Sequence, residues 1–295
     1  MVEPVPDADP DPDPADSARS LPSSDSNASA PLTKVGLAFR SAFASWLDCA
    51  PREIECIEVT AEEFYKGGRG RLRLLGSTYP MLVHTQRLSL GAPGPLDASE
   101  LHWFASLVSE AKPLWISDHL GFRCTRDVDL GSPNPIALNR GALNLVADRA
   151  RRIMEACRTP LLLENISACI AVKGSMSEPE FLSRLCETAG CGVLLDVTGL
   201  LVNSRNHAFD PVRWLDDLDR ARVTQVHIGG CMERDGYWDD THDGPIHADA
   251  WALLDEVLKR CSVEAIVLER DASFPAASEL RHELRRIKDL CNARG

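Results

Sequence analysis

Eight short apolar runs, rich in β-branched residues, recur along the chain from residue 34 onward and alternate with stretches of helical spacing. Such alternation is typical of a parallel sheet whose strands are connected by helices, and eight strands close a (β/α)8 barrel. An open, doubly wound sheet is the alternative, but no G-x-G-x-x-G sequence follows the first run. We therefore predict a TIM barrel with strands within residues 34–39, 54–60, 81–90, 113–122, 160–167, 192–199, 223–230 and 264–271.

Helix signals lie between these runs. Asp97, Ser177 and Asp210 stand where N-cap side chains are expected, and a glutamate follows the first two at the third position. Pro211 fits the first position of a helix. These signals predict helices within residues 95–112, 175–190, 209–221 and 277–290.

The first 32 residues differ in composition from the rest of the chain. They are rich in Pro, Asp and Ser and carry seven acidic residues against one arginine, which is half of the formal net charge of −12. This composition is typical of a disordered acidic tail, and it has neither the basic start nor the apolar centre of a signal peptide. We predict that residues 1–32 form a disordered tail and that residues 33–295 form a single barrel domain.

Composition also narrows the compartment and the partners. The chain has no run of about 18 apolar residues, so the sequence predicts no membrane association. The ten cysteines are scattered and form no C-x-x-C pair, which, without a signal peptide, favours reduced thiols and a cytoplasmic location. The acidic net charge disfavours nucleic acid as a partner, because phosphate backbones are bound by lysine and arginine.

One ionisable side chain lies near the C-terminal end of each of strands two to eight. Strands buried on both faces should be almost wholly apolar, and the C-terminal ends of TIM-barrel strands form the active-site face. Packing unpaired charges together at that mouth would cost several kcal/mol for each. A cation offsets this cost, and imidazole and carboxylate are the usual ligands of zinc, iron and manganese. The side chains are Glu58, His84, His119, Glu164, Asp196, His227 and Glu269.

Two loops add side chains of the same kind. They are residues 200–211, with Asn203, Asn206 and His207, and residues 231–247, with Asp240 and His242. Eight to ten potential ligands exceed the needs of one ion, so the sequence predicts two or three metal ions. Other polar residues have simpler explanations: we expect Glu58 to anchor the loop after its strand and His247 to cap the next helix.

The order and spacing of these motifs resemble the DUF692 proteins, also called multinuclear non-heme iron-dependent oxidative enzymes. The resemblance covers about residues 34–285. Each matching stretch is weakly specific alone, and their common order makes the resemblance specific. The stretches are EVTAEEFY, HTQRLSLG, ISDHLGF, LLLENIS, SEPEFL, LLDVTGLLVNSRNHAFDP, VHIGG, DTHDGP and LERD.

This resemblance implies a TIM barrel that holds two or three iron ions in a mixed Fe2+/Fe3+ state and uses O2 as co-substrate. The substrate would be a ribosomally synthesised precursor peptide, in which a residue, often a cysteine, is oxidatively modified. A separate partner protein would bind the leader of that precursor. The residues predicted to be catalytic are His84, His119, Glu164 and His227, and the predicted metal ligands are these four with Asp196, His207, Asp240, His242 and Glu269.

Several residues depart from the family pattern, among them Asp118, Thr60 and Glu63, and two of the departures bear on metal ligands. Thr198 stands where an asparagine ligand is expected, so that one metal position is weakened, lost or served by Asp196. Cys231 stands where a histidine is common, and it is either a ligand or a packing residue.

Two other classes of protein also fit the residues. One is a barrel enzyme with a redox-inert divalent metal, of the isomerase, epimerase or endonuclease type, although the acidic charge disfavours the endonuclease. The other is a catalytically impaired binding scaffold, which is supported by the departures from the family pattern at Thr198 and Cys231. Retention of the other charged strand ends argues against the scaffold, because buried charges without a use destabilise a fold.

Overall fold

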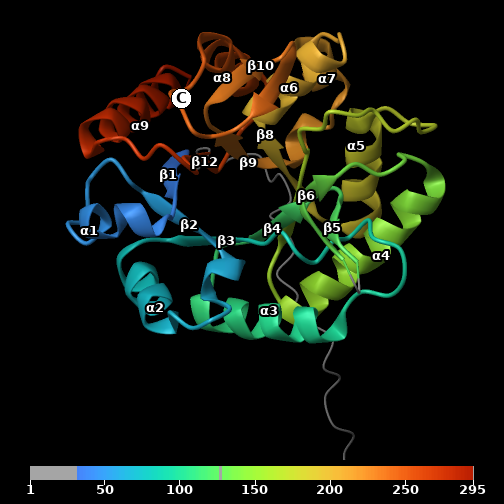
Figure 1. Ribbon diagram of the computed structural model, residues 1–295, viewed down its shortest axis with the longest axis horizontal. Coiled ribbons are helices and arrows are strands. Elements are labelled where there is room, and N and C mark those ends of the chain that lie inside the picture. The colour runs from blue at the N-terminus through green and yellow to red at the C-terminus, as the bar shows by residue number, and fades with distance from the viewer. Residues whose placement is uncertain (1–31, 126–127, 295) are drawn as a thin grey trace, which may run out of the picture.

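The computed structural model describes residues 32–125 and 128–294, so the predicted tail lies outside the described residues, apart from Leu32. Within them, eight parallel strands close a barrel, which confirms the predicted TIM barrel (Figure 1). The barrel strands are β1 (Lys34–Ala38), β2 (Cys56–Thr60), β3 (Met81–His84), β4 (Ile116–His119), β7 (Leu161–Glu164), β8 (Gly192–Asp196), β9 (Val223–Ile228) and β12 (Ala265–Leu268). Each strand pairs with the barrel strands that precede and follow it along the chain.

Several strands end at the polar residues that the sequence singles out. β3 ends at His84, β4 at His119, β7 at Glu164 and β8 at Asp196, each within its predicted range. The register places His119 beside Glu164, and Asp196 beside His227, on neighbouring strands.

An apolar layer fills the barrel interior beneath these polar strand ends. Side chains two positions apart on a strand point to the same face, and Leu82 and Leu162 precede His84 and Glu164 by that spacing. The polar side chains therefore point into the barrel, above a closely packed apolar floor. This floor consists of Ala38, Cys56, Leu82, Trp115, Leu162, Leu194, Ala265 and Val267.

Helices cover the outside of the barrel (Figure 1). They are α1 (Ala44–Leu47), α2 (Arg69–Thr78), α3 (Ala98–Ala111), α4 (Arg140–Cys157), α5 (Glu178–Ala189), α6 (Val197–Asn206), α7 (Pro211–Asp217), α8 (Ala248–Arg260) and α9 (Ala277–Asn292), with 3-10 segments at Ser41–Phe43, Ala61–Phe64 and Arg220–Arg222. Asp97, Ser177 and Asp210 accept backbone N–H bonds at the starts of α3, α5 and α7, as predicted. His247 caps α8, also as predicted. In the part of the chain that the structure describes, no helix is long and apolar enough to cross a membrane.

Two β-hairpins that the sequence analysis did not predict stand beside the mouth. They are β5 (Phe122–Cys124) with β6 (Asp129–Asn134), and β10 (Cys231–Arg234) with β11 (Tyr237–Asp240). The second hairpin corrects the prediction of a loop over residues 231–247. Asp235 and Gly236 form its two-residue turn with φ values of 51° and 80°. An Asp-Gly pair with both φ values positive is the signal for a hairpin turn of type I′.

The stretch predicted as a loop over residues 200–211 is largely helical. α6 begins directly after β8, because the Asp196 side chain caps it by accepting a hydrogen bond from Thr198 N at 2.9 Å. At the end of α6, Asn206 Nδ2 donates to Trp238 O at 2.8 Å, and Asn206 Oδ1 accepts from Trp238 N at 2.9 Å. Asn206 therefore fastens β11 to α6.

A pH dependence of folding stability is expected from Glu178, the first residue of α5. Trp214 Nε1 of α7 donates to Glu178 Oε2 at 3.2 Å, but burial outweighs this bond and raises the pKa of Glu178 to about 7. The folded state therefore holds this proton more tightly than the unfolded chain, whose carboxyl has a pKa near 4.5. The resulting stabilisation is complete below about pH 4.5 and is lost as the pH rises through 7.

Glu178→Gln removes this titration, so the free energy of unfolding should fall less steeply from pH 5 to 8 than in the parent protein. Urea unfolding at several pH values in this range measures the slope. Glu187→Gln, at an exposed position of the same helix, is the matched control and should leave the slope unchanged. Equal slopes in the parent and in Glu178→Gln would contradict the prediction.

Candidate metal centre

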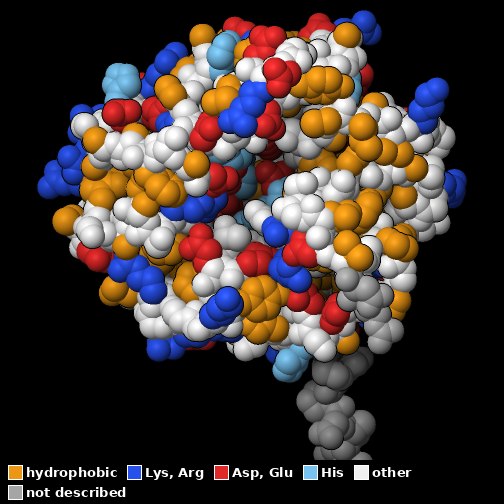
Figure 2. All heavy atoms as spheres, in the orientation of Figure 1, with side chains coloured by type: hydrophobic (Ala, Val, Ile, Leu, Met, Phe, Trp, Pro, Cys, Tyr) orange, Lys and Arg blue, Asp and Glu red, His pale blue; other side chains and the backbone are white. Residues whose placement is uncertain are grey.

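Eight of the nine predicted metal ligands line one cavity of about 540 Å3 at the mouth of the barrel. Figure 2 shows the hollow on this face, with acidic and histidine side chains inside it. Their ligand atoms form three groups, and within each group these atoms lie within 4.8 Å of one another. The first group is His84, His119 and Glu164; the second group is Glu58, His227 and Glu269; the third group is Asp196, Asp240 and His242.

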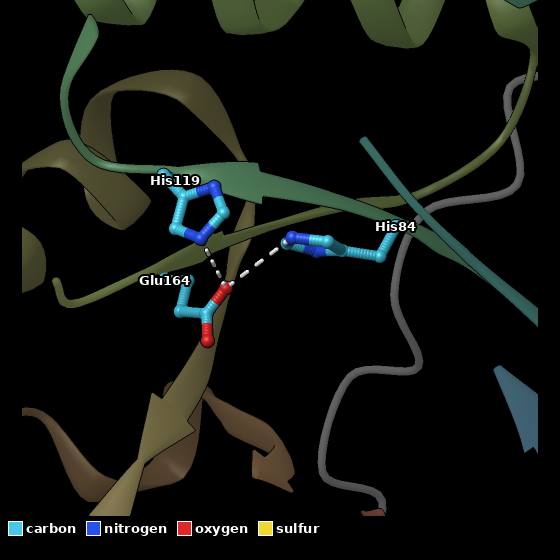
Figure 3. Close-up of side chains that lie close together, drawn as sticks. All are labelled: His84, His119 and Glu164. Atoms are coloured by element: carbon cyan, nitrogen blue, oxygen red, sulfur yellow. Dashed lines mark ion pairs between the residues drawn. The ribbon is translucent and has the colours of Figure 1, made fainter. Parts of the chain in front are cut away.

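The first group converges on one carboxylate oxygen. The Nε2 atoms of His84 and His119 lie 3.7 and 3.5 Å from Glu164 Oε2, and Figure 3 shows both rings directed at it. This oxygen is buried and accepts no hydrogen bond from the described residues. His84 Nδ1 lies 3.0 Å from Ser117 Oγ, which holds the ring with Nε2 toward the mouth. The group thus offers two imidazole nitrogens and a carboxylate to one ion.

Glu164 also connects the first group to the second. His227 Nδ1 lies 2.9 Å from Glu164 Oε1 and 3.2 Å from Glu269 Oε2, while its Nε2 lies 2.9 Å from Glu58 Oε1. The two oxygens of Glu164 therefore face different histidines. A carboxylate in this position can bind two ions, one on each oxygen.

The third group combines a barrel strand with the second hairpin. Asp196 ends β8, Asp240 ends β11, and His242 Nε2 lies 2.8 Å from Asp240 Oδ1. His242 Nδ1 lies 3.5 Å from Glu269 Oε2, which connects the third group to the second. The three groups are therefore continuous across the mouth.

Two glycines allow the third group to assemble. A Cβ atom at Gly199 would overlap the Asp196 carboxylate, and one at Gly229 would overlap the His242 ring. The chain after β11 returns directly over the end of β9, where His242 N donates to Gly230 O at 2.8 Å. His227, Asp240 and His242 thus build one wall of the centre.

The charges in the three groups fit bound cations. The groups contain five carboxylates and four histidines, all at the buried mouth. Burial opposes ionisation of Glu269, but His227 and His242 outweigh it and hold the pKa of Glu269 well below its usual range. Burial and the neighbouring Asp240 raise the pKa of Asp196 well above its usual range. Divalent cations would offset this crowding of carboxylates and would coordinate the unpartnered oxygen of Glu164.

Comparison with known proteins agrees with this geometry. A family model described as "RiPP precursor modification enzyme MbnB/TglH/ChrH" matches residues 34–292. The chain belongs to this family. The resemblance to DUF692 proteins that the motifs predicted is thereby confirmed.

Members of the family and other barrels show how far the similarity extends. The UPF0276 protein of Rhizorhabdus wittichii is 32% identical over 247 residues, covering 83% of this chain and 89% of the relative. A UPF0276 protein of Anaeromyxobacter sp. is 34% identical over 257 residues, covering 84% and 89%. Among solved structures, 3-keto-D-glucoside 4-epimerase from E. coli has a TM-score of 0.58 at 13% identity, covering 87% of this chain and 99% of its own. Endonuclease IV from Thermus thermophilus has a TM-score of 0.55 at 19% identity, covering 88% and 99%. At these identities the solved structures show the fold alone.

Three residues considered as possible ligands lie outside the groups of this RiPP-enzyme family member. The Thr198 hydroxyl accepts a hydrogen bond from Gly229 N at 2.9 Å and donates to Gly229 O at 3.2 Å, so it serves the backbone. Cys231 is half-buried, and burial followed by Asp240 raises the pKa of its thiol to about 11. His207 Nε2 lies 2.8 Å from Ala168 O. None of the three belongs to a group.

Other residues have a role at the mouth of this family member that the sequence did not predict. Glu58, expected to anchor a loop, belongs to the second group. Arg40 and Asp271 line the cavity, and Arg40 Nε donates to Asp271 Oδ1 at 2.8 Å. Asp271 could have been predicted as a residue of the mouth, because it is the last residue of the LERD stretch. Gln225 could have been found as a polar residue two positions before His227, on the same inward face of β9.

Proposed function

We propose that this chain is an iron- and O2-dependent enzyme that oxidatively modifies a residue, in the first instance a cysteine, of a ribosomally synthesised precursor peptide. One observation carries the proposal: three connected groups of histidine and carboxylate ligands, all but Glu58 lining one cavity, occur in a chain whose family modifies RiPP precursors. The continuous arrangement of the groups suits two or three ions better than one.

The donor atoms decide which residues would hold the metal. Imidazole nitrogen and carboxylate oxygen suit iron, as well as manganese and zinc. We assign one ion to His84, His119 and Glu164, a second to Glu164, His227 and Glu269, and a third to Asp196, Asp240 and His242. Iron with open coordination positions supplies a Lewis acid that deprotonates a bound thiol and, together with O2, an oxidant. We leave His207 out of this set.

The cavity fits part of a peptide rather than a whole folded substrate. A volume of about 540 Å3 lies in the range of small-molecule sites, which is far too small for a folded substrate. Its walls come from residues 132–135 at the end of β6, residues 165–170 after β7, and residues 238–240 of β11. We propose that the substrate places one side chain in the mouth while the adjoining residues lie across these segments. Arg40, held by Asp271 at the cavity wall, supplies the cationic side chain nearest to Glu269 there.

We further propose that a separate protein binds the leader of the precursor, as the resemblance implies. Apart from the barrel with its helices and the two hairpins, residues 32–125 and 128–294 form no further module that could do so.

Metal content is the first test of the proposed function. Protein purified without oxygen should contain two or more irons per chain by elemental analysis, with a mixed ferrous and ferric Mössbauer spectrum. Incubation with a cysteine-containing precursor peptide and its leader-binding protein should then consume O2 and change the mass of the peptide. One zinc or manganese without iron would instead favour a redox-inert, epimerase-like enzyme. Failure to take up any metal on reconstitution would favour a binding scaffold.

A further inference from the structure

A buried chain of hydrogen bonds lies beneath the second group. Trp115 Nε1 donates to Gln225 Oε1 at 2.6 Å, and Gln225 Nε2 donates to Glu58 Oε2 at 2.5 Å. The other oxygen of this carboxylate, Glu58 Oε1, lies 2.9 Å from His227 Nε2. All four side chains belong to residues that are no more than 5% exposed. We call Trp115, Gln225 and Glu58 the relay.

The chemistry of the groups fixes the direction of each bond in the relay. An indole N–H can only donate, so the oxygen of the Gln225 amide must face Trp115 and its NH2 must face Glu58. An ionised carboxylate can only accept, so Glu58 takes one N–H from Gln225 and offers its second oxygen to His227. The two nitrogens, Gln225 Nε2 and His227 Nε2, lie 2.9 Å apart. Gln225 could donate to an unprotonated Nε2 at this distance, but that tautomer would leave the Nε2 lone pair facing Glu58 Oε1 at 2.9 Å, whereas a protonated Nε2 donates to this oxygen.

We propose that the relay fixes the tautomer of His227: the proton stays on Nε2, which donates to Glu58, and Nδ1 is left to bind the metal. This inference rests on the proposed function, because it needs a metal at the second group. Nδ1 is the nitrogen that lies 2.9 Å from Glu164 Oε1 and 3.2 Å from Glu269 Oε2. Both of these carboxylates line the cavity, whereas Glu58 does not.

The proposal divides the second group into ligands and support. His227 and Glu269 bind the ion together with Glu164, and Glu58 is a positioning residue rather than a ligand. Gln225 acts one hydrogen bond further away and Trp115 two, by keeping the Glu58 carboxylate in place. Loss of residues that orient a histidine ligand typically lowers metal affinity by about 10–100-fold.

The test uses Zn2+ as a diamagnetic probe with the full chain. In protein labelled with 15N-histidine, the His227 signal, assigned by its absence from His227→Gln, should show a protonated Nε2 and a zinc-bound Nδ1. Calorimetric titration of Trp115→Phe and of Gln225→Leu should show Zn2+ affinity about 10–100-fold below that of the parent.

Trp214→Phe is the matched control. Trp214 is 7% exposed, against 5% for Trp115, and it donates its indole N–H to Glu178 at 3.2 Å, outside the cavity lining. Both tryptophan variants lose one buried indole hydrogen bond, so both should lower the thermal midpoint. Only Trp115→Phe should lower the affinity for Zn2+.

The possible outcomes separate this inference from the proposed function. Zinc bound through Nε2 of His227, or parent-like affinity in both Trp115→Phe and Gln225→Leu, would overturn the relay while the metal centre stands. If the parent protein binds neither Zn2+ nor Fe2+, the proposed function fails and the relay fails with it. The NMR measurement on the zinc-bound parent protein needs neither relay variant to fold, so it decides the tautomer even if both relay variants fail to fold.

Discussion

Replacing Glu164 with alanine is expected to remove metal from two groups at once. Its two oxygens face His84 and His119 on one side and His227 on the other. We therefore expect a drop in affinity at both positions that exceeds the roughly 10–100-fold cost of losing a merely supporting residue. Peptide oxidation should be lost as well. Elemental analysis after anaerobic reconstitution measures the number of ions that remain.

Two variants calibrate this result. Asp240→Asn alters the third group alone, so it should lose no more than one ion and fewer than Glu164→Ala. Glu178→Gln alters a carboxylate that lies outside the cavity lining and should retain every ion. If Glu164→Ala binds as many ions as the parent, the assignment of Glu164 as a shared ligand is wrong.

Arg270→Met is expected to lower the free energy of unfolding by about 3–5 kcal/mol, because it leaves a buried carboxylate without its cation. Arg270 follows β12, and its Nη2 donates to Glu283 Oε2 of α9 at 2.5 Å. The residues are 3% and 8% exposed. Glu283 Oε1 accepts from Ile246 N at 3.1 Å, and this is the partner that would remain. Urea unfolding in EDTA excludes any contribution from bound metal.

A second substitution tests the cause of that loss. Glu283→Gln in the Arg270→Met background removes the unpaired charge and keeps an acceptor for Ile246 N, so it should recover most of the lost free energy. Arg184→Met breaks an ion pair with Glu180 whose side chains are 55% and 41% exposed, and should cost under about 1 kcal/mol. A loss as small as this in Arg270→Met would show that the buried pair contributes little.

The fold and much of the site were predictable because both depend on regular spacing. Eight apolar runs predicted the barrel, and one polar residue near the end of a run predicted which side chains would meet. In the structure the register places His119 beside Glu164, and Asp196 beside His227, as the positions of these residues near their strand ends lead one to expect. Parallel strands in a closed barrel leave little freedom in this respect, since residues at equivalent heights must be neighbours.

The errors arose where local signals compete. Asp196 reads as a strand-end ligand, and it also caps α6, so residues predicted as a loop continue as a helix. The Asp235–Gly236 pair is a turn signal, but the many potential ligands around it favoured the prediction of a loop over residues 231–247 instead of a hairpin. Thr198 shows a limit of a different kind. Only the coordinates reveal that its hydroxyl both donates to and accepts from the Gly229 backbone.

The third group differs from the other two because one of its ligands, Asp240, comes from the second hairpin and not from a barrel strand. Asp196 is fixed once the barrel closes, whereas Asp240 belongs to β11, which Asn206 fastens through two hydrogen bonds to Trp238. An ion bound to the third group stabilises this closed hairpin over any opened form, by thermodynamic linkage. Trp238 and Asp240 also line the cavity. Binding of an ion to the third group would therefore also affect the shape of the cavity entrance. Loading the third ion would set the wall past which the proposed peptide substrate enters.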